Sequence, residues 1–164
     1  MDIEVSGDIG KFKLRSCGVI VRDGKMLVDR GRNFAGHVFL GGHVTVGENS
    51  RDTIVREAKE ELGVDVTIEK LLCINENIYE IPTTKNVAHE VAFYYMLETK
   101  DILPNEDFEV VENDNGTIIT HRYSWVDLNK ASECNVRPNW IAEMILENKE
   151  NYYYLTDNTR QNNE

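Results

Sequence analysis

The chain has 164 residues, 41% of them hydrophobic and 29% charged, which is the length and composition of one globular domain with a sizeable core. Its formal net charge of −11 argues against binding of a nucleic-acid polymer, which relies on clustered Lys and Arg. A small phosphorylated substrate stays compatible with this charge if metal ions lie between substrate and protein. No stretch approaches the roughly 18 apolar residues of a membrane helix, so we expect no membrane span.

Three cysteines, Cys17, Cys73 and Cys134, stand far apart in the sequence. An odd number at wide spacing fits neither a disulfide framework nor a CxxC metal site. The N-terminal residues lack the apolar core of a secretion signal. We therefore expect reduced thiols in a cytoplasmic protein.

The first predicted elements are strands. Residues 11–30 predict a hairpin, because an apolar strand is followed by the turn signal Asp23-Gly24 and by a second apolar run. After a loop, residues 37–40 predict a short strand that leads into a pair of glycines, Gly41 and Gly42.

Residues 42–64 then carry acids at the spacing of a helical metal site. Glu57, Glu60 and Glu61 stand at i, i+3 and i+4, which places them within an arc of roughly 100° if the segment is helical. The neighbouring arc is apolar: Ile54, Val55, Ala58 and Leu62. The segment has capping residues at both ends, namely Asn49 or Ser50 before it and Gly63 after it. Because clustered carboxylates repel, the pattern fits either a solvated acidic face or a site for a hard divalent cation.

The same segment resembles the Nudix box, a glycine, five residues, a glutamate, seven residues and then R-E-U-x-E-E-x-G-U, where U is a bulky aliphatic residue. The fixed positions are occupied by Gly42, Glu48, Arg56, Glu57, Ala58, Glu60, Glu61, Gly63 and Val64. Ala58 is small for a U position, and Leu40 and Thr45 stand where the family usually has Pro and often has Glu. The chain is thus similar to the small bacterial MutT-like Nudix enzymes, and fainter features extend the resemblance to about residue 146.

Further strands follow the box. Residues 64–68 and 71–79 predict two strands, and residues 89–97 predict a central strand that is apolar almost throughout. Residues 98–116 carry seven acids against one base, and we expect mostly a mobile loop there, with short strand pieces as an alternative. Residues 118–126 predict another strand.

The last predicted element is a helix from Arg137-Pro138 to about Asn148. We expect residues 1–10 to form a loose leader or a short edge strand, residues 11–150 a single domain and residues 151–164 a polar tail. Strands that alternate with one mid-chain and one C-terminal helix predict an α/β fold with helices on either side of a mixed sheet. The resemblance implies the same architecture, the Nudix α/β/α sandwich.

The resemblance also implies hydrolysis of a pyrophosphate bond in a nucleoside diphosphate linked to another group. Mg²⁺ or Mn²⁺ would polarise phosphoryl oxygens and lower the pKa of bound water. The implied metal ligands are Gly42 (through its carbonyl), Glu57, Glu60, Glu61 and Glu112. The candidates for the general base are Glu60 or Glu61 in the box, and Glu109, Glu112 or Glu90 outside it. Arg56 and Glu48 are implied to hold the loop against the helix by an ion pair.

Residues outside the box are candidates for substrate binding. Arg30 and Arg32 follow the second strand and could meet phosphate, or they could be ordinary exposed charges. Phe34, Phe39 and Tyr79 could stack on a base, or they could pack in the core. The histidines are expected to be structural: His43, His89 and His121.

Substrate choice lies outside the box. We expect a nucleoside triphosphate pyrophosphatase, with oxidised nucleotides included, and we keep an ADP-ribose or nucleotide-sugar pyrophosphatase as the alternative. Two further classes stay open: a Nudix domain that senses a nucleotide without hydrolysing it, and an interaction module that uses the acidic stretch 98–116. The expected partner is a small nucleotide, and a homodimer is an open alternative.

Overall fold

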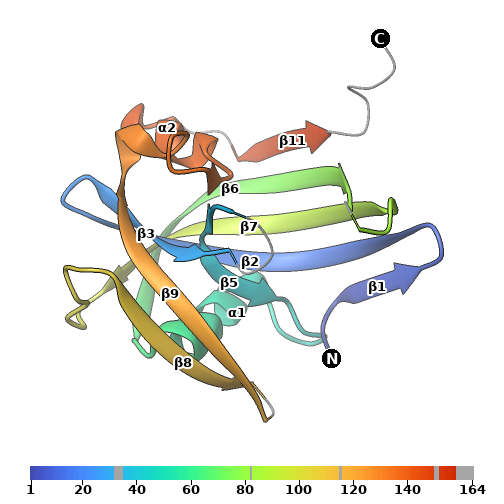
Figure 1. Ribbon diagram of the computed structural model, residues 1–164, viewed down its shortest axis with the longest axis horizontal. Helices are drawn as coiled ribbons and strands as arrows, with labels where there is room; N and C mark the ends of the chain where they lie inside the picture. Colours follow the sequence, from blue (N-terminus) through green and yellow to red (C-terminus); the bar gives the residue numbers. More distant parts are fainter. Residues whose placement is uncertain (32–34, 82, 115, 150–151, 158–164) are drawn as a thin grey trace.

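The computed structural model describes residues 1–31, 35–81, 83–114, 116–149 and 152–157. The strands are β1 (Glu4–Gly7), β2 (Gly10–Arg22), β3 (Lys25–Arg30), β4 (His37–Val38), β5 (Leu40–His43), β6 (Val66–Glu80), β7 (Val87–Thr99), β8 (Phe108–Asp114), β9 (Thr117–Asp127), β10 (Val136–Arg137) and β11 (Tyr153–Asp157). The helical segments are α1 (Ser50–Glu57), the π-helical turn η1 (Ala58–Leu62), the 3-10 turn η2 (Leu128–Lys130) and α2 (Trp140–Leu146). Figure 1 shows α2 at the top of the view and α1 below β2.

The long strand β2 connects two groups of strands. It runs parallel to β7 from Gly10 to Ile20, and its last residues, Val21 and Arg22, pair antiparallel with β3. The strand order is β10-β4-β3-β2-β7-β6-β11, while β1 and β5 also pair with β2, and β9 joins β3 to β8. Parallel and antiparallel pairs occur together, so the predicted mixed sheet is confirmed.

Side chains of the central strands alternate between two cores. Val19 belongs to the cluster that contains Ile141 of α2, whereas Ile20 belongs to the cluster that contains Ile54 of α1. Successive side chains of a strand point to opposite faces of its sheet, so α1 and α2 cover opposite faces. The predicted α/β/α sandwich is thereby confirmed. None of the helices in the described part of the chain is long and apolar enough to cross a membrane.

Within the acidic stretch 98–116, residues 100–107 are not in a strand, and the expected short strand piece is β8, which forms an antiparallel hairpin with β9. Phe108 and Val110 pack against the α1-side core, and this burial stabilises the strand. Its acids also find cationic partners on β9, since Glu109 contacts Arg122 and Glu112 contacts His121. Cross-strand partners of opposite charge favour a pairing that the acids alone would oppose.

Three other segments can be compared with the sequence predictions: one takes a predicted alternative, and two differ. Within residues 1–10, β1 pairs with β2, which is the edge-strand alternative. The two strands predicted over 64–79 form one strand, β6, with two register shifts where it pairs with β7. Part of the expected polar tail forms β11, which runs parallel to β6 and whose Tyr154 stacks on Trp140 at 4.1 Å.

The C-terminal helix is shorter than expected, because α2 begins at Trp140 and residues 136–137 form β10 instead. Its apolar side faces the core, and Ile141 and Met144 are buried. All three cysteines are free thiols; Cys17 and Cys73 are buried and Cys134 is half-buried.

Candidate active site

The helical segment α1–η1 supplies one side of the site. Asn49 caps its start, since the Asn49 side chain accepts hydrogen bonds from the backbone N–H groups of Arg51 and Asp52, both at 3.0 Å. Gly63 ends it in the left-handed conformation with φ of 78°. Both predicted caps are confirmed. The segment thus presents Glu57 and Glu61 one helical turn apart, both more than nine-tenths buried.

The glycine pair of β5 lets these two carboxylates approach the backbone. A Cβ atom at Gly42 would lie 2.2 Å from Oε1 of Glu57, so the absence of a side chain there is required for the observed position of that carboxylate. The backbone N–H of Gly41 donates to Oε2 of Glu61 at 3.0 Å. Gly41 itself has φ of 141°, and a Cβ there would lie 2.2 Å from the backbone oxygen of Ser16.

Burial makes both carboxylates harder to ionise. It raises the pKa of Glu57, although the charge of Arg56 acts in the opposite direction. It raises the pKa of Glu61 to about 7, in spite of the hydrogen bond from Gly41 and the nearby His121. Buried acids that resist ionisation are stabilised as anions by a cation, so this cluster has the electrostatics of a cation site.

Arg56 connects the loop after β5 to the acids of the helix. Its Nε lies 3.0 Å from Oε1 of Glu48, and its Nη1 lies 2.8 Å from Glu57 and 2.7 Å from Glu60. The Arg56 hydrogen bonds are the main cause that lowers the pKa of Glu48 to about 2. The ion pair that the resemblance implies between Arg56 and Glu48 is therefore present in the structure.

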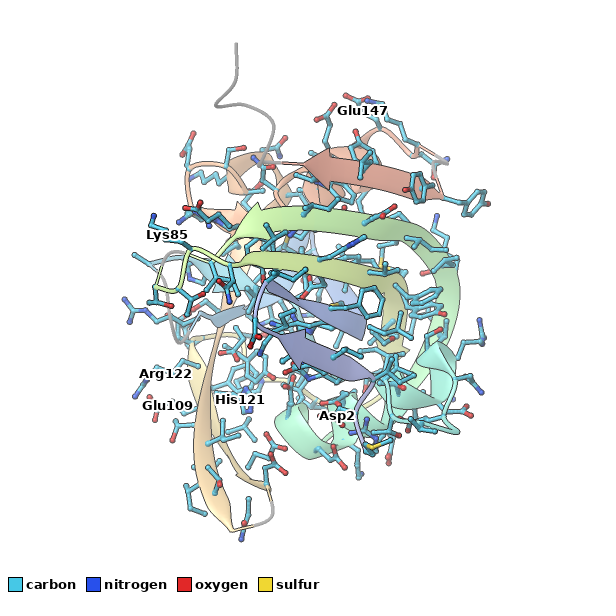
Figure 2. All side chains as sticks on the ribbon, turned by 90° about the vertical axis from the view of Figure 1, so that its right-hand side faces the viewer. Asp2, Lys85, Glu109, His121, Arg122 and Glu147 are labelled. Atoms are coloured by element: carbon cyan, nitrogen blue, oxygen red, sulfur yellow. The ribbon has the colours of Figure 1, made fainter. Side chains whose placement is uncertain are left out.

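The β8–β9 hairpin supplies the other side of the site. Nε2 of His121 lies 3.0 Å from Oε2 of Glu112, and its Nδ1 lies 2.8 Å from Oδ2 of Asp29 on β3. Burial alone would lower the pKa of His121, but the hydrogen bonds to these carboxylates outweigh it and raise the pKa to about 9. In Figure 2 His121 lies on the inner side of the hairpin, and Glu109 and Arg122 lie on its outer edge.

The two sides meet at Glu61, Glu112 and His121, whose ligand atoms all lie within 4.8 Å of one another. With the Gly42 carbonyl and Glu57 beside them, the donor set is dominated by oxygen, which suits Mg²⁺ or Mn²⁺. The residues present therefore fit a divalent cation.

The other candidate acids differ in their surroundings. The side chain of Glu60 is 45% exposed and contacts the same Nη1 of Arg56 as Glu57, so these two acids are neighbours. Glu109 pairs with Arg122 on the outer face of the hairpin, and Glu90 is buried on β7, with its carboxylate 3.8 Å from Arg15. The structure brings Glu61, Glu112 and His121 together, and Glu109 and Glu90 lie outside that group.

The substrate-binding candidates are scattered. The prediction that Phe39 stacks on a substrate base is wrong. Phe39 is buried and packs edge-to-face on Tyr94 in the core, where a base cannot reach it. Tyr79 is half-buried on β6. Arg30, at the end of β3, lines a cavity of about 520 Å³ together with Arg122. Two candidates, Arg32 and Phe34, lie outside the described residues.

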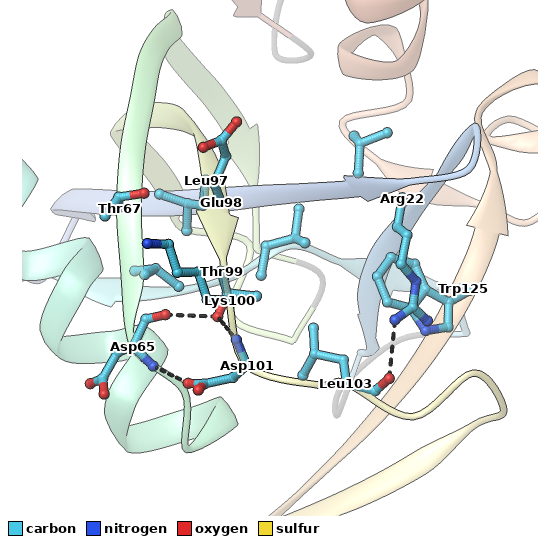
Figure 3. A pocket seen from close by; sticks show the side chains of 13 residues that line it. Arg22, Asp65, Thr67, Leu97, Glu98, Thr99, Lys100, Asp101, Leu103 and Trp125 are labelled. Carbon is cyan, nitrogen blue, oxygen red and sulfur yellow. Dashed lines mark hydrogen bonds between the residues drawn. The ribbon is translucent and has the colours of Figure 1, made fainter.

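A larger cavity, of about 660 Å³, lies at the C-terminal ends of β2 and β7 (Figure 3). Arg22 lies over the ring of Trp125 at 4.2 Å and donates hydrogen bonds to the carbonyls of Leu103 and Pro104. Among the described residues, none of the acids assigned to the site lines this cavity. Size alone therefore does not mark the site of chemistry in this protein.

Three residues of the site escaped the sequence analysis. Arg15 donates from Nη2 to the Gly41 carbonyl at 2.8 Å, and Asp29 and His121 form the buried pair described above. Asp29 directly follows the apolar run of residues 26–28, and a charge at such a position is a signal that could have found it, because a buried charge needs a partner. Arg15 stands among other polar residues and carries no such signal. His121 was expected to be structural, yet it contacts Glu112 directly.

Comparison with known proteins identifies the family of this chain. The model of the NUDIX domain matches residues 13–146 of the chain. An ADP-ribose pyrophosphatase of Methanocaldococcus jannaschii is 32% identical over 84 residues, which are 49% of this chain and 47% of that protein. The match thus spans about half the length of this curated relative. The chain belongs to the Nudix hydrolase family, a class of pyrophosphohydrolase enzymes.

Solved structures show the same fold. A mutator MutT protein from Bacillus halodurans has a TM-score of 0.60 at 15% identity, over 90% of this chain and 92% of the other. An ADP-ribose pyrophosphatase from Streptococcus suis has a TM-score of 0.51 at 18% identity, over 88% and 98%. At such identities, these similarities concern the fold alone.

Proposed function

We propose that the protein hydrolyses a pyrophosphate bond in a nucleoside diphosphate linked to a second group, in a reaction that depends on Mg²⁺ or Mn²⁺. The observation that carries this proposal is the convergence of Glu61 from the helix with Glu112 and His121 from the hairpin, while the Glu57 carboxylate lies against the glycine pair. A diphosphate needs its charge neutralised and a water molecule activated near phosphorus. An acidic cluster meets both needs only through bound cations.

The residues that would hold the cations are the Gly42 carbonyl, Glu57, Glu61 and Glu112, with Glu60 as a further candidate. Bound there, the cations would polarise the phosphoryl oxygens and acidify a water molecule. Arg56 keeps Glu57 and the loop at Glu48 in place. Glu61 and Glu112 are the general-base candidates that lie within the cluster, whereas Glu60 and Glu109 are each held by an arginine.

Two arginines are the candidates for binding substrate phosphate in this proposal. Arg15 reaches the carbonyl of Gly41 and so lies next to the glycine pair, and its buried Nε has no hydrogen-bond partner among the described residues. Arg30 lines the cavity beside the hairpin. A guanidinium with a free donor suits a phosphate oxygen, which accepts hydrogen bonds from such a fork.

For the substrate we favour ADP-ribose or a related nucleotide sugar over a nucleoside triphosphate, which reverses the order expected from the sequence. The support is the 32% identity to a protein named an ADP-ribose pyrophosphatase. The nucleoside triphosphate, oxidised or not, is the second candidate. A nucleotide sensor without activity is disfavoured because every acid of the box is retained.

The remaining expectations are part of the same proposal. The small nucleotide is the partner that this site would take, and residues 11–150 would form its single domain. A cytoplasmic location is supported by the three free thiols.

The test is product release from a panel of nucleotide sugars, nucleoside triphosphates and dinucleoside polyphosphates with Mg²⁺ and with Mn²⁺. A coupled phosphatase reports the phosphomonoesters formed. We expect ADP-ribose to yield AMP and ribose 5-phosphate, and a chelator to stop the reaction. Nucleotide binding without turnover across the panel would favour the sensor instead.

A further inference from the structure

A series of side-chain contacts runs from β3 through β9 to β8 and ends at the acidic cluster. His121 lies between two carboxylates, with Asp29 at 2.8 Å on Nδ1 and Glu112 at 3.0 Å on Nε2. Glu112 in turn has its ligand atom within 4.8 Å of that of Glu61. His121 therefore connects a buried aspartate to an acid that the hairpin brings to the helix.

Hydrogen-bond chemistry restricts what His121 can do there. A carboxylate oxygen can accept a hydrogen bond from a ring nitrogen, and each ring nitrogen of His121 has one carboxylate within hydrogen-bond distance. Glu112 is the partner of Nε2, and Asp29 is the partner of Nδ1. This arrangement suits His121 to hold Glu112.

The imidazole is fixed in position and in plane. Asp29 is buried, and its other carboxylate oxygen accepts a hydrogen bond from the backbone N–H of Arg122 at 2.8 Å. The ring of Tyr123 stacks with that of His121, with centroids 6.0 Å apart and planes 18° apart, and Phe108 stacks on Tyr123. A group held from several sides can impose one orientation on the carboxylate that it contacts.

The other paired acid of the hairpin shows the contrast. Glu109 meets Arg122 at 2.7 Å, but both side chains are 58% exposed. An exposed pair of this kind orders its carboxylate weakly, because solvent competes with the contact. The side chain of His121 is 1% exposed, so its contact with Glu112 has no such competition.

We propose that His121, itself held by Asp29, is a positioning residue that aims the Glu112 carboxylate at the cation site beside Glu61. The inference rests on the proposed function, because it takes the cluster to bind a divalent cation. It adds that the hairpin delivers its acid to the site through a buried histidine.

Two amide variants separate the two contacts of the ring. Gln at position 121 places an amide N–H near the position of Nε2 and can still donate to Glu112, whereas Asn places one near Nδ1 and can still donate to Asp29. The readout is the dissociation constant of Mn²⁺ alone, measured by calorimetry without substrate. We expect His121→Asn to weaken Mn²⁺ binding by about 10- to 100-fold, the range found for partners of metal ligands, and His121→Gln to retain binding within about threefold.

Stability and kinetics are measured on the same proteins. Thermal unfolding with chelator present reports any structural loss, and Asp29→Asn serves as a milder variant if His121→Asn does not fold. The control is Val111→Thr, a change at the neighbouring, 64% exposed position of β8, which should leave Mn²⁺ binding unchanged. When turnover is measured at limiting Mn²⁺, we expect His121→Asn to have a lower kcat than wild type. This difference in kcat should diminish when the Mn²⁺ concentration is raised.

The outcomes are distinct. Equal Mn²⁺ affinity in His121→Asn and wild type would overturn the inference. It would also be overturned if the Asn and Gln variants lost Mn²⁺ affinity equally and in proportion to their fall in unfolding temperature. Normal Mn²⁺ binding by Glu112→Gln would overturn it as well. Histidine-dependent Mn²⁺ binding without turnover on any substrate would support the inference and refute the proposed function.

Discussion

On the helical side of the candidate active site, Glu57 and Glu61 stand one turn apart on a single segment, and Arg56 from that segment contacts Glu57 directly. On the hairpin side, Glu112 is held by His121, whose second partner, Asp29, is 92 residues away in the sequence. The first arrangement follows from helical spacing, whereas the second exists only when three strands are paired in register.

This difference has a physical consequence. Helical spacing keeps Glu57 and Glu61 near each other even if their surroundings loosen, because they stand four positions apart on one helical segment. The position of Glu112 depends on buried hydrogen bonds between strands, which are lost when the hairpin moves away from β3. The helix side should therefore determine whether a cation binds at all, and the hairpin side should determine how tightly it binds.

The largest expected effect comes from the helix acids. Changing Glu57 or Glu61 to Gln should lower kcat/KM by more than about a hundredfold, because even the partners of metal ligands contribute up to that factor. Stability should change little or rise, since burial disfavours the charge of both groups. Steady-state kinetics and thermal unfolding measure the two effects, with Lys59→Gln on the exposed face as control. A Glu57→Gln enzyme with its full rate would remove Glu57 from the reaction.

The glycine pair offers a matched contrast. In Gly42→Ala the new Cβ meets the Glu57 carboxylate, a movable group, so we expect a loss of roughly a hundredfold in kcat/KM with a small change in stability. In Gly41→Ala the new Cβ meets the backbone of Ser16 at a φ of 141°, so we expect a loss of about 1–3 kcal/mol in unfolding free energy. Steady-state kinetics and urea unfolding on both variants measure kcat/KM and the unfolding free energy. Equal losses of kcat/KM and of unfolding free energy in the two variants would contradict the expected contrast.

The free energy of unfolding should depend on pH through Glu48. Its pKa is lowered from 4.5 to about 2, chiefly by hydrogen bonds from Arg56. A lowered pKa in the folded state means that the stabilisation is fully present above pH 4.5 and is lost as the pH falls toward 2. Glu48→Gln should therefore be about 1–3 kcal/mol less stable near pH 7, and the difference should narrow in acid. Urea unfolding at several pH values measures it, and a difference independent of pH would refute the attribution to Arg56.

A substitution away from both sides of the site should change stability without changing turnover or Mn²⁺ affinity. Tyr154 stacks on Trp140, with ring centroids 4.1 Å apart, and holds β11 against α2. Tyr154→Ala should lower the free energy of unfolding by about 0.5–1.5 kcal/mol, which is the value of such an aromatic pair. Turnover and Mn²⁺ affinity should stay at wild-type values. A marked fall in kcat would show that β11 contributes to the site.

The helix side could be predicted from the sequence because its geometry is local. The helix could be predicted from the i, i+4 spacing and from the caps at Asn49 and Gly63. The apolar residues of the strands predicted a sheet with helices on both faces. Glu112 was expected near the metal only through the family resemblance, and its partner His121 was expected to be structural.

The hairpin side could not be predicted because strand register is not local. The sequence shows seven acids over residues 98–116, and their repulsion argues for a loop unless the cations of β9 are known to face them. Likewise, nothing in the runs around Asp29 and His121 indicates that β3 and β9 are neighbours. The short strand β11 has too few residues for a clear pattern, and its partner Trp140 lies on a helix.

The central claim is that acids of the helix and of the hairpin form one cation site. The most direct measurement is a double-mutant cycle on Mn²⁺ affinity with Glu61→Gln, Glu112→Gln and the double variant, each by calorimetry. We expect both single changes to weaken binding, and we expect the double variant to lose less than the sum of the two losses because both carboxylates serve the same ion. Strictly additive losses, or Mn²⁺ binding that Glu112→Gln leaves unchanged, would contradict the account.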